Sequence, residues 1–194
     1  MAISDQKLIA AANRGSEDAY RALVERYQQP VIGLVTRIVR DRAWAEDLAQ
    51  DSFIKAFRAL ATFQVERKFS SWLFKIAHNT AIDAIRRKRV ETVPLETPER
   101  EGLDLLDCLP GSDIDSPDRV LEGRNLAGSL TQAMGELRPE YRAVMDLRFI
   151  QGLAYDEIAE IMELPLGTVK THIHRARKAL VRALGEQGIE PTSK

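Results

Sequence analysis

Residues 155–184 read YDEIAEIMELPLGTVKTHIHRARKALVRAL, and this stretch joins two helical patterns of opposite charge. The first pattern ends at Glu163 and is short and acidic. A break at Leu164-Pro165-Leu166-Gly167 follows, and the second pattern starts at Thr168. From Gly167 to Leu184 there is no acid, and the cations are Lys170, Arg175, Arg177, Lys178 and Arg182. Two helices joined by a short turn, with the positive charge on the second, predict a helix-turn-helix whose second helix enters the DNA major groove.

Helical spacing gives the second helix a core side and a DNA side. Val169, Ile173, Ala176 and Leu180 recur as one buried face, while the opposite face, free to meet bases and phosphates, carries Lys170, Thr171, His174, Arg175 and Lys178. Pro165 should end the first helix, and Thr168 should cap the second. Ala154 stands where a Ser or Thr cap is expected, at a cost of about 1 kcal/mol. The alternative, a merely solvated amphipathic helix, would normally mix both signs of charge.

Charge is segregated along the chain although the net charge is only −1. Residues 1–90 hold 16 basic and 10 acidic side chains, a balance of +6. Residues 91–118 hold one basic and nine acidic side chains, a balance of −8. Residues 119–194 hold 11 basic and 10 acidic side chains, with the cations gathered on the last helix. A near-neutral average is therefore compatible with DNA binding, because an acidic segment separates two modules.

Composition also limits the class of protein. Cys108 is the single cysteine, so an intramolecular disulfide framework is excluded. The first residues lack the basic and apolar regions of a signal peptide, and no apolar run approaches membrane-spanning length. We therefore expect a soluble, cytoplasmic protein.

Helical periodicity dominates residues 1–90, which predicts an N-terminal bundle. Ser16 and Asp41 are expected helix caps, and Pro30 is expected to start or kink a helix. An apolar face from Ala45 to Leu60 predicts a third helix, and a polar loop over 64–68 precedes a fourth helix over about 70–89.

Residues 91–118 carry four of the eight prolines and nine acids, which predicts a flexible linker. The helical pattern resumes from Arg119, and Pro139 should begin a helix that ends at Gln151-Gly152. The expected architecture is all-α, with an N-terminal domain over 1–90, a linker over 91–118, a helix-turn-helix domain over 119–187 and a tail over 188–194.

Two faces of the N-terminal domain are unusual. Opposite its apolar stripe, the third helix carries Glu46, Asp47, Gln50, Asp51 and Ile54, for which a solvated surface is the ordinary explanation. Around the fourth helix, aromatic rings alternate with cations, as single-stranded DNA binding requires, although the rings could also be core. This second set contains Phe63, Phe69, Trp72, Phe74, Lys75 and the run 86–89.

These residues resemble a known family, the extracytoplasmic-function (ECF) sigma factors of bacterial RNA polymerase. Segments 15–23 (GSEDAYRAL), 45–53 (AEDLAQDSF) and 69–79 (FSSWLFKIAHN) look like successive motifs of the σ2 domain of that family. Segments 155–159 (YDEIA) and 165–171 (PLGTVKT) are similar to its σ4 domain. The motifs stand in the family's order and cover nearly the whole chain.

The resemblance implies roles for the candidate residues. Glu46, Asp47, Gln50, Asp51 and Ile54 would dock on the β′ clamp helices of core RNA polymerase, and the σ4 domain would meet the β flap. The −10 promoter element would be held by Phe63, Gln64, Lys68, Phe69, Trp72, Lys75, Asn79, Arg86 and Arg87. The −35 element would be read by Thr168, Lys170, Thr171, His174, Arg175, Arg177 and Lys178. An anti-sigma protein is an expected further partner, and no cofactor or metal is expected.

One motif departs from the family. The base-capturing loop of many relatives starts Phe-Arg-Gly-Asp, whereas this loop reads Phe63-Gln64-Val65-Glu66-Arg67. A −10 sequence preference therefore cannot be transferred from those relatives.

Two other function classes remain as alternatives. A self-sufficient helix-turn-helix regulator would share the C-terminal pattern but has no reason for an acidic docking helix followed by an aromatic, basic one. An enzyme has little support, because His78, His172 and His174 lack carboxylate or cysteine partners at ligand or triad spacing. A redox role for the isolated Cys108 is a minor alternative.

Overall fold

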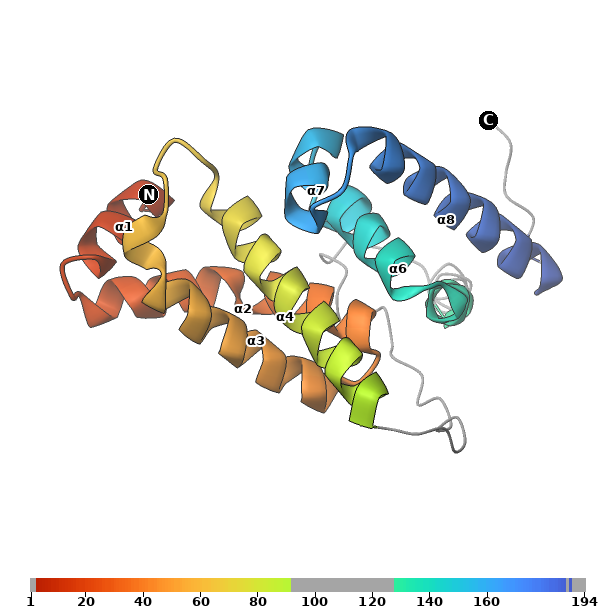
Figure 1. Cartoon of the computed structure of the whole chain (residues 1–194), viewed down its shortest axis with the longest axis horizontal. Helices are drawn as coiled ribbons and strands as arrows, with labels where there is room; N and C mark the ends of the chain where they lie inside the picture. The colour runs from red at the N-terminus through yellow and green to blue at the C-terminus, as the bar shows by residue number, and fades with distance from the viewer. Residues whose placement is uncertain (1–2, 92–127, 188, 190–194) are drawn as a thin grey trace, which may run out of the picture.

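A computed structural model describes residues 3–91, 128–187 and 189, and over these residues the chain is helical with no strand (Figure 1). The all-α prediction is confirmed. The predicted acidic linker, with Cys108, falls almost entirely outside the described residues, as does most of the tail. No described helix combines the length and apolar character that crossing a bilayer requires.

The N-terminal domain is a bundle of four α-helices and one short 3₁₀ turn. In chain order these are α1 (Asp5–Ala12), α2 (Glu17–Val39), α3 (Arg42–Arg58), η1 (Leu60–Thr62) and α4 (Phe69–Glu91). Helices α2, α3 and α4 pack on one another around fully buried side chains such as Leu23, Leu34, Ile38 and Leu73. Burying each such aliphatic side chain contributes about 1.5–3 kcal/mol, so this apolar core stabilises the bundle.

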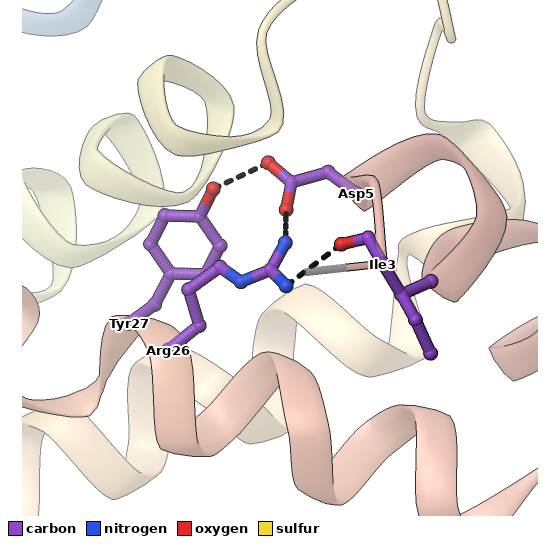
Figure 2. A network of polar contacts seen from close by, with 4 residues as sticks. All are labelled: Ile3, Asp5, Arg26 and Tyr27. Carbon is purple, nitrogen blue, oxygen red and sulfur yellow. Dashed lines mark hydrogen bonds and ion pairs between the residues drawn. The ribbon is translucent and has the colours of Figure 1, made fainter. Parts of the chain in front are cut away.

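The first helix is held on α2 by polar contacts as well as apolar ones. Figure 2 shows Asp5 accepting hydrogen bonds from the Arg26 guanidinium and the Tyr27 hydroxyl. Arg26 also donates to the backbone carbonyl of Ile3 at 2.8 Å. Burial, together with the bond to Asp5, raises the pKa of Tyr27, so this hydroxyl stays protonated as a donor.

The C-terminal domain is a second helical unit. A helix covers residues 128–136, followed by α6 (Pro139–Met145), a π-helical turn η3 (Asp146–Ile150), α7 (Tyr155–Met162) and α8 (Leu166–Glu186). Pro139 starts α6 as predicted. Ala133 and Leu137 pack with Ala176 and Leu180 of α8.

Several helix boundaries test the predicted helix caps and the predicted role of Pro30. The Ser16 hydroxyl accepts from the Ala19 N–H, and the Asp41 carboxylate accepts from the Trp44 N–H at 2.9 Å, so both caps are confirmed. Pro30 does not start a helix, because α2 runs through it.

The predicted cap at Thr168 is wrong. Helix α8 begins earlier, at Leu166, and the Thr168 N–H already donates to the Pro165 carbonyl at 2.8 Å. The fixed φ of Pro165 prepares the helical start three residues sooner than a cap at Thr168 would. At Ala154 the missing cap is partly replaced, because the Glu157 carboxylate accepts from the Ala154 N–H at 2.9 Å.

The two domains pack directly against each other, with α4 on α7 and α2 on α6 and η3 (Figure 1). Buried side chains of both domains belong to one apolar cluster that includes Leu73, Ala77, Ile158 and Ile161. The sequence pattern predicts two domains but not this contact between them.

Arg142 of α6 anchors the domain contact. It is 6% exposed and donates to backbone carbonyls at the end of α2, those of Arg37 and Ile38, and to the carbonyl of Leu137 in its own domain. One turn later, Asp146 is fully buried and pairs with Arg37 at 2.7 Å. Burial lowers the pKa of Arg142 to about 10, so its guanidinium is still charged at neutral pH.

We predict that Arg142→Met lowers the free energy of unfolding by about 2–5 kcal/mol, because several buried carbonyls lose their donor. Urea unfolding followed by circular dichroism measures this. The matched control is Arg138→Met, which changes an exposed arginine four residues earlier and should alter stability by less than about 0.5 kcal/mol. Equal effects of the two substitutions would contradict the anchoring role of Arg142.

Candidate functional site

The outer face of α8 is polar and basic from Lys170 to Lys178, and the exposed Val181 follows further along the helix. Val169, Ile173, Ala176 and Leu180 are buried as predicted, so the opposite side of the helix points to solvent. Six predicted DNA-binding residues of α8 are exposed and Thr168 is half-buried; the exposed ones are Lys170, Thr171, His174, Arg175, Arg177 and Lys178. The hydroxyl of Thr171 donates to the Gly167 carbonyl at 2.9 Å, which fixes its rotamer on the helix.

Helix α7 packs against α8 and is joined to it by a tight turn. Ile158, Ile161 and Met162 are buried, and the chain leaves α7 through Glu163 in the left-handed region, with φ of 54°. Pro165 then sets the start of α8. This geometry is the predicted helix-turn-helix, with the cationic helix on the outside.

The acidic face of α3 is also open. Glu46, Asp47, Gln50, Asp51 and Ile54 are all exposed, and Ile54 keeps 48% of its surface in solvent. Glu46 pairs with Arg42 on the same helix at 3.2 Å. An apolar side chain surrounded by acids on an open helix face suits a basic protein helix as a partner.

The aromatic residues around the start of α4 divide into core and surface. Phe63 is 9% exposed and Phe69 is 2% exposed, and each packs against Trp72 with ring centroids 5.2 and 5.7 Å away. Trp72 is only half-buried. The two phenylalanines are therefore placed to hold the loop, and Trp72 is the ring of this cluster with a face toward solvent.

The predicted cations near the start of α4 are engaged with the other domain. Lys68 pairs with Glu157 at 2.8 Å, and Lys75 pairs with Glu163 at 2.9 Å. The Lys68–Glu157 pair raises the pKa of Lys68, and the Lys75–Glu163 pair lowers the pKa of Glu163. Partial burial acts to raise the pKa of Glu157, but hydrogen bonds from Lys68, the Ala154 N–H and Ser71 outweigh it and hold this pKa below its usual range.

The remaining residues that are predicted to bind the −10 element differ in their exposure to solvent. Gln64, Arg86 and Arg87 are exposed, whereas Asn79 is half-buried beside His78, with Nδ1 and Oδ1 3.2 Å apart. His78 itself is 6% exposed, and burial lowers its pKa, so it is a neutral core residue. The part of the chain that the structure describes contains no cluster of metal-ligating side chains.

A cleft of about 540 Å³ lies between α4 and α7, where Ser71, Trp72 and Lys75 face Glu157, Glu160 and Ile161. Lys68 and Lys75 in this cleft are predicted DNA contacts, whereas the sequence pattern predicts no role for the acids of α7 or for Arg67. The available signal was the acidic spacing 157, 160 and 163 on the helix preceding a basic one.

Comparison with known proteins decides the family. Two family models match, Sigma-70 region 2 over residues 23–91 and Sigma-70, region 4 over residues 127–180. The RNA polymerase sigma-H factor of Pseudomonas aeruginosa is 36% identical over 93% of both chains. The ECF RNA polymerase sigma factor SigW of Bacillus subtilis is 35% identical over 92% of this chain and 96% of its own. The chain is an ECF sigma factor of the sigma-70 family.

Solved structures share the fold of this sigma factor. CnrH in complex with the cytosolic domain of CnrY superposes with a TM-score of 0.64 and 26% identity, over 94% of this chain and 97% of that one. The sigma factor RpoE of Bartonella quintana, in complex with the anti-sigma factor NepR, has the same fold, with a TM-score of 0.65, 21% identity, and coverage of 86% and 96%. Sigma factors confer promoter specificity on RNA polymerase and are not themselves enzymes.

Proposed function

We propose that this sigma factor binds core RNA polymerase through α3 and selects promoters through two DNA-binding surfaces. In this proposal the outer face of α8 reads the −35 element, and the loop from Phe63 to Phe69 with α4 captures and melts the −10 element. The observation that carries the proposal is the separation of an open acidic face on α3 from an open basic face on α8. A protein that bound only DNA would have no use for an exposed acidic face on α3.

The −35 surface is proposed from exposure and hydrogen-bonding capacity. Arg175 offers the planar donor pair that recognises guanine in the major groove, and His174 and Lys170 are exposed beside it. Arg177 and Lys178 are assigned to phosphates, where charge matters more than geometry. Thr168 and Thr171 lie in the first turns of α8, the end that would enter the groove.

The −10 surface is proposed from the loop, α4 and Trp72. Gln64 and Asn79 would contact an extruded base, and Trp72 would stack on it. Lys68, Lys75, Arg86 and Arg87 would hold the backbone of the melted strand. Phe63 and Phe69 contribute by fixing the loop from within the core.

The proposed partners follow from the same assignment. Core polymerase would meet the α3 face with its β′ clamp helices and the C-terminal domain with its β flap, which places the protein in the cytoplasm. An anti-sigma protein is proposed as a regulator; chains of this fold have been solved with protein partners, among them the cytosolic domain of CnrY. The proposed domain limits are 1–90 and 119–187.

Promoter-selective transcription in vitro tests the proposal. Discrete transcripts from a genomic fragment library should appear only when the protein is added to core polymerase that lacks any sigma factor, and their start sites would locate both promoter elements. Asp47→Arg should abolish them, because it reverses the charge of the docking face, and leave promoter DNA binding by the protein alone intact. Glu25→Arg, the same charge change on α2, is the control. Sequence-specific DNA binding without any transcript would favour the independent helix-turn-helix regulator.

Arg175→Ala is predicted to weaken binding to a promoter identified in this way by about 1–3 kcal/mol if the side chain reads a base. Fluorescence anisotropy with promoter and random duplexes measures the effect. Arg182→Ala, which removes an exposed arginine two turns further along α8 that already pairs with Glu186, should have little effect. An equal loss on both duplexes would reassign Arg175 to a phosphate contact.

A further inference from the structure

Carboxylates on α7 and at its C-cap face cations in the loop before α4 and in the first turns of α4. We call Glu157, Glu160 and Glu163 the acidic row, and Arg67, Lys68 and Lys75 the basic row. The pairs Lys68–Glu157, Arg67–Glu160 and Lys75–Glu163 are 2.8, 3.1 and 2.9 Å apart. Ser71 adds a hydrogen bond to Glu157 at 3.3 Å. Every carboxylate of the acidic row has its own cation across the domain boundary.

The basic row contains the groups that would hold DNA. Lys68 and Lys75 are proposed contacts of the −10 strand, and Arg67 lies next to Lys68 in the same loop. Carboxylates and phosphates are both anionic oxygen acceptors and compete for the same N–H donors. Trp72, the proposed stacking platform, lines the cleft between the two rows. A DNA strand and the acidic row cannot satisfy these cations together.

We propose that α7 is an intramolecular competitor of promoter DNA, so that the free sigma factor is self-blocked at its −10 surface while its −35 surface stays open. This inference rests on the proposed −10 role of α4. In this account the helix-turn-helix domain has two functional sides. The cations of α8 face DNA, and the acids of α7 face the N-terminal domain.

Buried contacts between the two domains hold the acidic row opposite the basic row. Leu73 and Ala77 of α4 and Ile158 and Ile161 of α7 are buried in one shared cluster. Arg142 and the Arg37–Asp146 pair attach the same domain to α2. Opening the cleft therefore moves the C-terminal domain as a unit.

The charge pairs at the rim are suited to a reversible block. Glu160 and Glu163 keep 68% and 61% of their side-chain surface exposed, so water and salt screen these two pairs. An exposed ion pair of this kind changes an equilibrium constant by up to about fivefold. The apparent affinity for DNA falls in proportion to the fraction of molecules that are open, so weakening the pairs should raise that affinity.

The test uses the full chain with Glu160→Gln and Glu163→Gln together. Glu157 is kept because it also caps α7. In a Trp44→Phe background Trp72 is the sole tryptophan, and quenching of its fluorescence by acrylamide reports opening of the cleft. Anisotropy of a labelled thymidine oligonucleotide of about twelve nucleotides reports binding of a single strand. We expect more quenching and roughly two- to twentyfold tighter binding, with the difference shrinking as salt rises.

The matched control is Glu17→Gln with Glu25→Gln, which makes the same charge change on exposed acids of α2. It should match the parent in both measurements. The inference is overturned if the α7 variant quenches like the parent, if it opens without tighter binding, or if the control gains as much affinity. Transcription with core polymerase separates this failure from failure of the proposed function, because the variant would still direct promoter-specific transcripts in the first case and neither protein would in the second.

Discussion

The arrangement of the two domains depends on the hydrogen bonds that Arg142 makes across the domain boundary. Its guanidinium satisfies carbonyls at the end of α2, where a helix has no further N–H groups of its own to offer. Asp146, one turn away, is buried and paired with Arg37. Because an unpaired buried charge costs several kcal/mol, these contacts allow one orientation of the C-terminal domain and penalise others. That orientation sets α7 over α4.

The same orientation of the C-terminal domain determines which of the proposed functional surfaces are exposed and which is covered. The acidic face of α3 and the basic face of α8 both remain in solvent, so each is accessible to a partner in the described arrangement. The start of α4 differs, since its cations meet the acidic row of α7. In this account, a sigma factor so arranged can find polymerase first and expose its melting surface afterwards.

How much the sequence could predict depends on the range of the interaction. Local rules located the caps at Ser16 and Asp41 and the buried stripe of α8, because these depend on neighbours within one or two turns. The Thr168 cap failed because a proline three residues earlier competed with it. The domain contact was not predictable, since Arg142 and Asp146 look like ordinary charges on a helix until their partners on α2 are known. For the same reason, Phe63 and Phe69 could not be separated from Trp72 as core rings.

Zero-length carbodiimide cross-linking of the free wild-type protein tests the central claim most directly, because this chemistry joins a lysine amine to a carboxylate only when the two are in contact. Mass spectrometry should identify Lys75–Glu163 and Lys68–Glu157 cross-links within single molecules at low salt, and both should be lost when core polymerase and promoter DNA are added. Glu163→Gln should remove the first cross-link alone. Absence of both cross-links in the free protein, or their persistence in the complex with polymerase and promoter DNA, would contradict the closed arrangement or its competition with DNA.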